Sequence, residues 1–371
     1  MKTVAVYTRD GIIASSSYYR IWQYFSKIES CKVLPRIFIP TFLTRAQYNT
    51  SANSFYGVFV RGIYHLFVYF GALFYFLKDS FFPPDCVVIL RSVTPKSFVF
   101  PINILYSTVL TRTQKVVWDF DDNIVVSNEI SQKEKTLLEN KADQIVVTHS
   151  ALFSVLKTEN VKKVTCLCTT DGDFFCGNWP DLEKKRLESF KNEVRILWLT
   201  SSSGFVDIKK IRNILDESAK RVQSILGKKL VLVVVCNKPY EEKFDFLTVE
   251  NHTWDRKIAL KYCETSHIGI MPLMKTEFAL GKGAFKIVQY FAAGLPVIAS
   301  KVGFNEHVVK DNENGFCLLD DDNQNLWSDS IMALAKDEEL WKRFSENARL
   351  SWNQNFNYKK NFEFWSQIAE R

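Results

Sequence analysis

One stretch of the chain, residues 268–302, restricts the fold more than any other. It reads IGIMPLMKTEFALGKGAFKIVQYFAAGLPVIASKV. The stretch predicts a buried strand (Ile268–Met271), a polar loop with glycines, and a helix over about Ala284–Ala293. A Gly-Leu-Pro turn and a second strand (Val297–Ser300) follow. A strand, a helix and another strand in this order are typical of a parallel sheet.

The same alternation continues through the rest of the chain and predicts an α/β protein with doubly wound parallel sheets. The other expected strands are short apolar or β-branched runs: Val4–Tyr7, Val33–Ile39, Cys86–Leu90, Val116–Phe120, Ile145–Thr148, Val164–Cys168, Ile196–Leu199, Leu230–Val235 and Gly315–Leu318. Further helices are expected over Ile208–Leu226, Asn323–Lys336, Glu338–Asn353 and Tyr358–Glu370.

A length of 371 residues exceeds what one ordinary hydrophobic core accommodates, so two domains are expected. The alternation lapses between Thr169 and Asn192, where Asp, Gly, Pro and charged residues predict a linker with a short helix. We therefore expect a Rossmann-like N-terminal domain over residues 1–175 and a Rossmann-like C-terminal domain over residues 190–356. The two domains are expected to face each other across a cleft.

The charge is distributed unevenly along a chain whose formal net charge is +7. Residues 1–118 hold 13 Lys and Arg against four Asp and Glu, so the N-terminal half is strongly basic. This asymmetry indicates an anionic partner, either a membrane surface or a nucleic acid. Because the sequence shows no RNA-binding signature and no zinc-finger pattern, we expect no nucleic acid partner.

The eight cysteines are scattered, and no CxxC pair occurs. Only Cys166 and Cys168 are close, and alternate strand residues point to opposite faces, so they are poor zinc partners. Reduced thiols in a cytoplasmic protein are the expected state. Met1–Tyr7 predicts a first strand and not a signal peptide.

The segment Val58–Leu77 is the exception to the pattern of a soluble protein. It is nearly long enough to span a membrane, but Arg61 and His65 interrupt it, and its unbroken apolar run is Leu66–Leu77. It could span the membrane, lie buried in the core, or lie in the membrane interface. The aromatic residues, the basic flanks at Arg61 and Lys78 and the basic N-terminal half favour the interfacial helix.

Lys282, Lys286 and Gln289 are separated by four and three residues, which places them within one narrow arc of a helix. Two ammonium groups in such an arc repel each other unless an anion lies between them. Gly281 and Gly283 let the backbone approach a ligand closely, at a helix N-terminus that favours phosphate. The pattern indicates a nucleotide site of an open α/β sheet, and a surface lysine stripe is the alternative.

These residues resemble the donor-binding region of the retaining GT-B glycosyltransferases of family 4. The resemblance is to the surface-polysaccharide subgroup that carries the motif GKGxFKxxQYxAxGxPVxAS. It continues through Val302–Glu306 and Asp311–Phe316, and the segments Ser15–Ile21 and Trp118–Asp122 also resemble that subgroup. The resemblance implies a GT-B fold, in which the last helix, here residues 357–371, packs back on the N-terminal domain. It also implies that the N-terminal domain binds the acceptor and the C-terminal domain binds the nucleotide-sugar donor.

The resemblance further implies which residues bind the donor. Lys282 and Lys286, with the amides of Gly281 and Gly283, would neutralise charge on the leaving diphosphate. Gln289 aligns with the second glutamate of the family's EX7E motif, which contacts the ribose hydroxyls. The first glutamate aligns with Gly281, so this chain lacks both acids, and Glu277 or backbone amides are the candidates to replace it.

Most family members carry an Arg and a Lys after the first strand of the second domain, whereas this chain has Thr200, Ser201 and further serines. Their hydroxyls and amides are candidates for binding phosphate or sugar. Capping of a helix by Ser202 or Ser203 is equally open. Trp254 is a candidate for stacking on the base, and packing in the core is its alternative role.

The sequence WDFDD at residues 118–122 ends a predicted strand and so directs three carboxylates to the rim of the expected cleft. We interpret Asp119 and Asp121, on the same side of that strand, as residues that bind acceptor hydroxyls or position the acceptor nucleophile. Asp122 is interpreted as a cap of the next turn. A metal site is disfavoured, since GT-B enzymes hold the diphosphate with cations and helix dipoles.

Three more acceptor-side candidates come from the N-terminal half. Gly11 follows the first strand and permits close approach of a ligand. Arg20 faces either the diphosphate or a structural carboxylate. His149 either binds substrate or caps the helix that starts at Ser150.

The sequence therefore predicts a retaining glycosyltransferase. It would transfer a hexose-type sugar from a nucleotide diphosphate to a membrane-linked glycan acceptor, in capsule, O-antigen or other exopolysaccharide synthesis. No cofactor is expected beyond the nucleotide-sugar substrate, and the protein is expected at the inner face of the cell membrane. The alternatives are a GT-B nucleotide-sugar epimerase and a non-catalytic subunit that binds nucleotide sugar or glycan.

Overall fold

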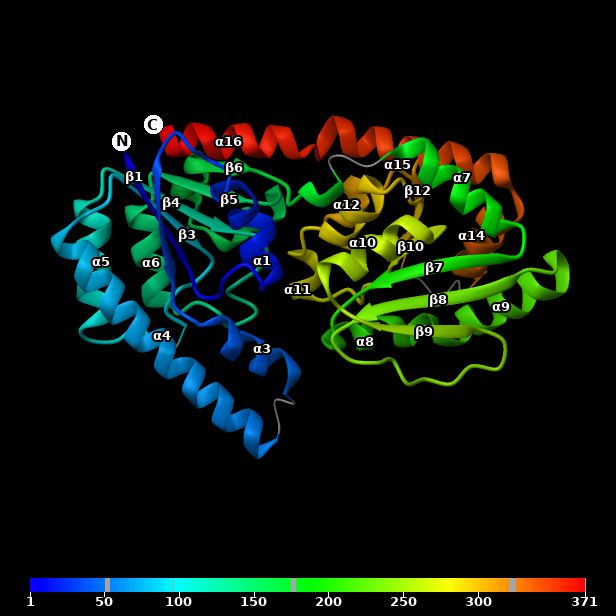
Figure 1. The fold of residues 1–371 in the computed structure, drawn as a ribbon, viewed down its shortest axis with the longest axis horizontal. Coiled ribbons are helices and arrows are strands. Elements are labelled where there is room, and N and C mark those ends of the chain that lie inside the picture. The colour runs from blue at the N-terminus through cyan, green and yellow to red at the C-terminus, as the bar shows by residue number, and fades with distance from the viewer. Residues whose placement is uncertain (51–53, 96, 175–177, 320–324, 371) are drawn as a thin grey trace. The chain divides into compact units, whose positions relative to one another are not determined.

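The computed structural model describes the chain except residues 51–53, 96, 175–177, 320–324 and 371 (Figure 1). The chain divides into two compact units, and each is built on a six-stranded parallel sheet. The first unit comprises Met1–Thr169 and Lys359–Arg371, and the second comprises Thr170–Tyr358. The predicted α/β fold with two parallel sheets is confirmed. The predicted domain end at residue 175 and the predicted helix start at Asn323 lie outside the described residues.

The sheet of the first unit has the strand order β2-β1-β3-β4-β5-β6. Its strands are β1 (Thr3–Thr8), β2 (Lys32–Ile37), β3 (Cys86–Leu90), β4 (Lys115–Phe120), β5 (Gln144–Val147) and β6 (Val164–Cys166). Its α-helices are α1 (Ser15–Ser17), α2 (Gln23–Phe25), α3 (Thr41–Asn49), α4 (Phe55–Phe81), α5 (Ile102–Arg112), α6 (Gln132–Lys141) and α16 (Tyr358–Glu370). A π-helical turn (Tyr18–Trp22) joins α1 to α2, and the 3-10 helices are Ser150–Val155 and Thr158–Lys163.

Both faces of the first sheet are buried, as expected of a parallel sheet. Tyr7 and Trp118 of one face share an apolar core with Phe76 of α4 and Tyr106 of α5. The Phe76 and Tyr106 rings are stacked with centroids 4.3 Å apart. Figure 1 shows α4 and α5 side by side along this sheet. Residues of the other face, such as Val6, are also fully buried.

Helix α16 completes the first unit from the far end of the sequence. Its Trp365 is fully buried, and the ring lies 5.5 Å from that of Phe25 in α2. Asn361 donates a 2.7 Å hydrogen bond to the carbonyl oxygen of Cys168. The core of the first unit therefore depends on residues from both ends of the described chain.

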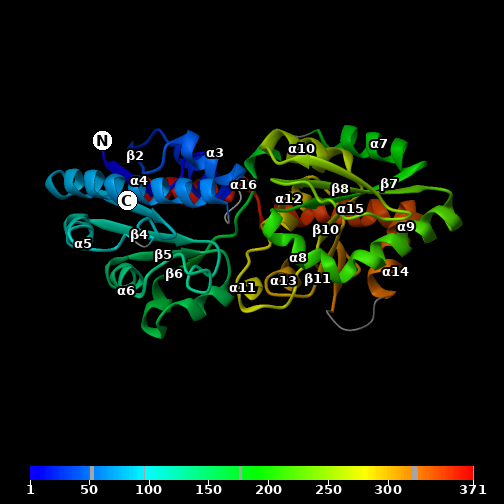
Figure 2. The same cartoon turned by 90° about the horizontal axis from the view of Figure 1, so that it is seen from below.

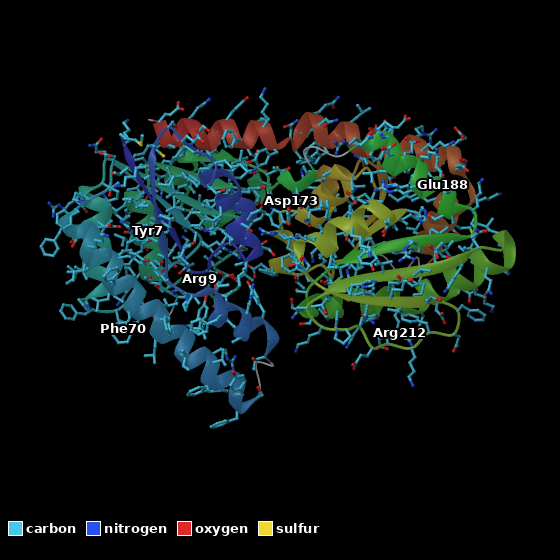
Figure 3. The ribbon with its side chains drawn as sticks, in the orientation of Figure 1. Tyr7, Arg9, Phe70, Asp173, Glu188 and Arg212 are labelled. Atoms are coloured by element: carbon cyan, nitrogen blue, oxygen red, sulfur yellow. The ribbon has the colours of Figure 1, made fainter. Side chains whose placement is uncertain are left out.

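Helix α4 contains the segment Val58–Leu77 and is longer than that segment, with 27 residues. A stripe at four-residue spacing, from Val60 through Tyr64, Val68 and Ala72 to Phe76, is buried in the core. The opposite side of the helix exposes large apolar side chains, including Phe67, Phe70 and Phe74. Figure 3 shows Phe70 on the outer side of α4. By length and composition α4 could cross a membrane, but its inner stripe is part of the core of the first unit.

The sheet of the second unit has the strand order β12-β11-β10-β7-β8-β9. Its strands are β7 (Glu193–Leu199), β8 (Lys229–Cys236), β9 (Thr248–Thr253), β10 (Ile268–Met271), β11 (Val297–Ser300) and β12 (Gly315–Leu318). Its α-helices are α7 (Trp179–Phe190), α8 (Phe205–Ile208), α9 (Arg212–Leu226), α10 (Arg256–Thr265), α11 (Glu277–Leu280), α12 (Phe285–Ala292), α13 (Asn305–Val308), α14 (Asn325–Lys336) and α15 (Glu338–Asn355). The 3-10 helices are Gly172–Phe174, Ser202–Gly204 and Lys209–Ile211.

The core of the second unit joins alternate residues of the sheet to α9, α14 and α15. Trp198 and Ile270 represent the sheet in this core, and Leu215, Ile331 and Trp341 come from the three helices. Figure 2 shows α9 and α14 together below the sheet. The sheet thus provides a rigid base for the loops that leave its strand ends.

Three details differ from the sequence prediction. The helix predicted over Ile208–Leu226 is divided into α8, a 3-10 turn and α9. The short helix expected in the linker is the 12-residue α7. An edge strand, β9, was not predicted because its sequence, TVENHT, is largely polar and each of its residues is at least partly exposed.

Candidate functional site

The strand order of the second unit creates a switch point between β7 and β10. From β7 the chain proceeds to β8 and β9 on one side, and β10 leads to β11 and β12 on the other. All six strands are parallel, so their carboxyl ends lie along one edge. The loops after β7 (residues 200–204) and β10 (residues 272–284) leave this edge in diverging directions, which is where open α/β sheets bind ligands.

Tyr290 fixes helix α12 to this switch point. Its buried hydroxyl accepts a 2.8 Å hydrogen bond from the Leu199 amide and donates one of 3.3 Å to the Ile270 carbonyl oxygen. Burial keeps the pKa of Tyr290 well above its usual range, so the hydroxyl stays protonated. A Cβ atom at Gly269 would lie 2.4 Å from the Tyr290 ring, so this approach requires glycine. One side chain thereby joins α12 to the ends of β7 and β10.

The loop before α12 is held in a compact conformation. Ala284, the residue before the helix, is buried and has a φ of 52°, which is left-handed and strained for alanine. Gly303 has a φ of 58°, and a Cβ there would lie 2.8 Å from the Ala279 carbonyl oxygen. Glycine at 303 therefore allows a neighbouring turn to pack against the short helix α11.

The arrangement of the lysines differs in part from the predicted stripe. Lys286 and Gln289 share a side of α12, but Lys282 lies in the loop before the helix, so the three do not form one helical arc. The Lys282 ammonium is 3.9 Å from the Asp207 carboxylate, with both side chains partly exposed. Asp207 also accepts a 3.0 Å hydrogen bond from the Met274 amide. Asp207 therefore connects α8, which follows the loop after β7, to the loop after β10.

Gln289 is buried and bonded to a side chain, not to the backbone. Its carboxamide nitrogen donates a 2.7 Å hydrogen bond to the Asp171 carboxylate, which is also buried. Asp171 lies at the start of the second unit and accepts a further bond of 2.9 Å from the Asp173 amide. Sequence reasoning did not identify Asp171, because 118 residues separate it from Gln289.

The loop after β7 forms a tight turn of hydroxyl residues. Ser201 and Ser203 hydroxyls lie 2.7 Å apart, and the Ser202 amide donates to the Asn237 side chain at 2.8 Å. A Cβ at Gly204 would lie 2.4 Å from the hydroxyl oxygen of Thr200. No side-chain cap bond is found at the N-terminus of the 3-10 turn or of α8, so the capping role considered for Ser202 and Ser203 is not seen.

The remaining donor-side candidates occupy the same loops. Glu277 is exposed at the first position of α11, and Gly281 follows that helix directly. Gly283 lies in the loop that leads to α12. Trp254 is partly buried and directly precedes Asp255, which caps α10 by accepting from the Lys257 amide at 2.8 Å.

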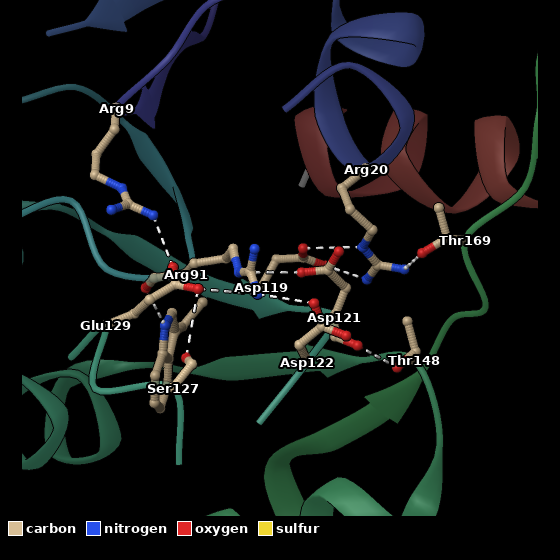
Figure 4. Close-up of polar contacts among 11 residues, drawn as sticks. Arg9, Arg20, Arg91, Asp119, Asp121, Asp122, Ser127, Glu129, Thr148 and Thr169 are labelled. Carbon is tan, nitrogen blue, oxygen red and sulfur yellow. Dashed lines mark hydrogen bonds and ion pairs between the residues drawn. The ribbon is translucent and has the colours of Figure 1, made fainter. Parts of the chain in front are cut away.

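In the first unit, Arg20 and Asp119 form a buried ion pair (Figure 4). The Arg20 Nε lies 3.0 Å from an Asp119 carboxylate oxygen, and the guanidinium also contacts Thr169 and the Leu167 carbonyl oxygen. Burial raises the pKa of Asp119 to about 6, against the lowering effect of Arg20, so the carboxyl is ionised at neutral pH. Arg20 therefore faces a structural carboxylate, one of its two predicted alternatives. The sequence placed Asp119 at the rim of the expected cleft, whereas its side chain is fully buried within the first unit.

A second arginine cluster occupies the switch point of the first sheet, between β1 and β3. Arg91, directly after β3, lies 2.9 Å from Asp122, 3.3 Å from Asp121 and 3.3 Å from Glu129. Arg9, directly after β1, lies 2.7 Å from Glu129. Although burial opposes the charge, the three carboxylates raise the pKa of Arg91. Figure 4 shows these side chains together.

Sequence reasoning missed Arg9, Arg91 and Glu129. The positions of the two arginines, each immediately after a strand, were visible in the sequence. Their proximity follows only from the strand order, which places β1 beside β3. Asp122, which the sequence suggested as a cap of the next turn, forms an ion pair with Arg91.

The other two acceptor-side candidates have ordinary surroundings in the first unit. Gly11 is buried, and a Cβ there would meet only Ile37 at an ordinary 3.7 Å. His149 is buried and precedes the 3-10 helix Ser150–Val155 without a side-chain cap bond. Among the described residues, no group of His, Cys, Asp or Glu is arranged to hold a metal ion.

Residues 181–351 match the family described as glycosyl transferases group 1. No curated protein sequence matches the chain.

Solved structures show which fold the whole chain has. HepE from Anabaena, solved with UDP-glucose, is 15% identical, with a TM-score of 0.64 over 100% of this chain and 98% of that one. Sucrose-phosphate synthase from Thermosynechococcus elongatus is 14% identical, with a TM-score of 0.63 over 99% of this chain and 98% of that one. TarM from S. aureus, solved with fondaparinux, alpha-GlcNAc-glycerol and UDP, is 14% identical, with a TM-score of 0.51. The match covers 81% of this chain but only 59% of TarM, less than two thirds of that protein. The fold is that of the GT-B glycosyltransferases.

Proposed function

We propose that this protein is a glycosyltransferase that moves a hexose-type sugar from a nucleotide diphosphate to a glycan acceptor. The observation that carries the proposal is the switch point of the second unit, where Lys282, Lys286 and Gln289 accompany a glycine-containing loop. This site lies within residues 181–351, the part that matches group 1 glycosyl transferases. HepE, with the same fold, was solved with UDP-glucose.

The chemistry follows from charge at the leaving group. When the bond between sugar and diphosphate breaks, negative charge develops on the diphosphate, and positive groups already in place lower the barrier. Lys286 in the first turn of α12 and Lys282 in the preceding loop would provide this charge. Thr200, Ser201, Gly281 and Gly283 would supply hydroxyl and amide donors. Retention of the anomeric configuration is part of the proposal and is supported by the motif resemblance alone.

A binding panel tests the donor. We expect UDP-, GDP- or dTDP-sugars to raise the melting temperature of the purified protein, and the stabilising donor to be consumed only when an acceptor glycan is present. Consumption without acceptor, with a new sugar isomer as product, would indicate an epimerase. Binding without turnover would indicate a non-catalytic subunit, and the absence of any binding would refute the proposal.

We further propose that the acceptor is membrane-linked and that the protein binds the inner face of the cell membrane through α4. The outer side of α4 exposes Phe70 and Phe74 at 60% and 62%, while its inner stripe is occupied by the core. Because one side of α4 packs into the protein core, only the opposite side can contact lipid, as in a helix that lies in the membrane interface. The exposed Lys78 and the basic residues 1–118 complement an anionic lipid surface. Such an acceptor is consistent with capsule, O-antigen or exopolysaccharide synthesis.

Vesicle sedimentation tests this location. Phosphatidylglycerol-containing vesicles should bind the protein reversibly, with an affinity that falls as salt rises. Replacing Phe67, Phe70 and Phe74 with Ser should abolish this binding while leaving donor binding unchanged. Retention after high-salt and carbonate washing would show instead that the helix spans the bilayer. Unfolding of the triple variant would show that the exposed side belongs to the core.

A further inference from the structure

The pair formed by Asp171 and Gln289 has a chemical consequence for any ligand at the switch point. Both side chains are buried, and the Gln289 nitrogen lies 2.7 Å from an Asp171 carboxylate oxygen. Asp171 is not on α12 or on either loop of the switch point, but in the segment where the chain enters the second unit. Its hydrogen bond to Gln289 connects this segment to α12.

The chemistry of the pair fixes the orientation of the carboxamide. An ionised carboxylate can only accept hydrogen bonds, whereas a carboxamide has a donor nitrogen and an acceptor oxygen. The nitrogen must therefore face Asp171, and the planar geometry of the amide directs its oxygen elsewhere. Rotation by 180° would place oxygen against oxygen, which leaves two buried acceptors without a proton between them.

The Gln289 oxygen is available to a ligand. Within the described part of the chain, no donor bonds to it, and it is not among the buried side-chain atoms that lack a partner. The oxygen thus keeps access to solvent although the residue is largely buried. A free acceptor oxygen held at this position suits a hydroxyl group.

We propose that Asp171 is a positioning residue, which holds the Gln289 carboxamide so that its oxygen accepts a hydrogen bond from a hydroxyl of the bound nucleotide sugar. This inference rests on the proposed function. It assigns Gln289 the acceptor role that a carboxylate would have, although glutamine carries no charge of its own.

The charge of Asp171 also strengthens that acceptor. A hydrogen bond from the amide nitrogen to a carboxylate polarises the amide and increases the negative charge on its oxygen. The pair therefore carries one negative charge, as a single glutamate at 289 would, but holds it one side chain further from the ligand.

Exchange of the two side chains tests the idea. In Asp171→Asn, residue 171 can donate as well as accept, so the Gln289 amide is no longer held in one orientation. The double variant Asp171→Asn with Gln289→Glu exchanges amide and carboxylate, so that position 171 donates and position 289 again presents an acceptor oxygen. Asp173→Asn, which removes an exposed carboxylate two residues away, is the matched control.

Calorimetric affinities for UDP, 2′-deoxy-UDP and UDP-glucose give the readout. If the hydroxyl belongs to the ribose, the wild type should prefer UDP over 2′-deoxy-UDP by about three- to tenfold, the contribution of one hydrogen bond. Asp171→Asn should remove this preference, and the double variant should restore it. If the hydroxyl belongs to the sugar, the same pattern should appear instead in the ratio of affinities for UDP-glucose and UDP.

The outcomes separate this inference from the proposed function. A wild type that binds neither these three probes nor any other nucleotide sugar of the donor panel refutes both. A wild type that binds them, with both ratios unchanged in Asp171→Asn, refutes only the role of Asp171. If Asp171→Asn does not fold, the double variant is measured instead. A folded double variant that shows neither the preference for UDP over 2′-deoxy-UDP nor that for UDP-glucose over UDP would also refute the inference. If Asp173→Asn changes the affinity ratios as much as Asp171→Asn does, loss of any nearby negative charge explains the result. That outcome would overturn the inference.

Discussion

The two units place cations at comparable edges of their sheets but pair them differently. In the first unit, Arg9 and Arg91 lie within 3 Å of the carboxylates of Glu129 and Asp122. In the second unit, the Lys282 ammonium is 3.9 Å from Asp207 and both groups are partly exposed. The arginines of the first edge are neutralised by short ion pairs with carboxylates of the same unit. In the proposed function, Lys282 of the second edge would leave its longer contact with Asp207 to bind a ligand phosphate. Under the proposed function, we therefore expect the first edge to suit neutral hydroxyl ligands and the second edge to suit anions.

The largest expected effect concerns the buried pair of the first unit. Asp119→Ala should lower the free energy of unfolding by about 3–5 kcal/mol, because Arg20 would remain as a buried charge without its partner. Urea unfolding measures this loss. Asp122→Ala is the control, since its partly exposed pair should contribute no more than about 1 kcal/mol. Equal losses in the two variants would contradict the structural role of Asp119.

The next effect concerns the proposed phosphate-binding edge of the second unit. Lys286→Ala should reduce sugar transfer at saturating donor by about two orders of magnitude, as expected when a charge partner of the transition state is lost. Its melting temperature should match that of the wild type. Lys336→Ala, an exposed lysine at the end of α14, serves as the control. A near wild-type rate in Lys286→Ala would place the phosphate contact elsewhere.

A smaller effect distinguishes the two units by pH. His267 is buried in the second unit, accepts from the Arg195 amide at 2.9 Å and contacts the Arg186 carbonyl oxygen at 3.0 Å. Burial, assisted by nearby Arg186 and Arg195, lowers the pKa of His267 to about 3. At pH values between the usual histidine pKa and about 3, His267 is protonated in the unfolded state but neutral in the folded state. The free energy of unfolding therefore decreases as pH falls through this range, by about 1.4 kcal/mol per pH unit.

The comparison of wild type with His267→Gln isolates this contribution. The wild type's advantage in unfolding free energy should be complete above about pH 6.5 and shrink towards pH 4. Asp119 in the first unit has the opposite effect on the free energy of unfolding. Because its pKa is raised, the folded state binds a proton before the unfolded state does as pH falls, which favours the folded state. An advantage that does not change with pH would show that His267 titrates normally.

The smallest expected effect is that of a chelator. Transfer activity should be unchanged by EDTA, because lysines and a helix N-terminus neutralise the diphosphate in the proposed mechanism. Initial rates with and without EDTA provide the measurement. Complete loss of activity, restored by manganese or magnesium, would instead make Asp121 a candidate metal ligand.

Local sequence patterns predicted much of the fold and some of the residues that lie in the candidate site. The strands β10 and β11 begin and end where the apolar runs Ile268–Met271 and Val297–Ser300 do, because burial on both faces gives a strong local signal. The pairs Arg20–Asp119 and Gln289–Asp171 had no such signal, since 99 and 118 residues separate their members. The break between α8 and α9 also escaped prediction.

The discontinuity of the first unit has a consequence for the order in which the chain matures on the ribosome. Residues 359–371, which contribute the buried Trp365, are synthesised after the whole of the second unit. The second unit is one continuous segment and can therefore close its core while the surface around Phe25 still lacks its cover. Although domains usually fold in the order of their synthesis, here the N-terminal unit is completed last.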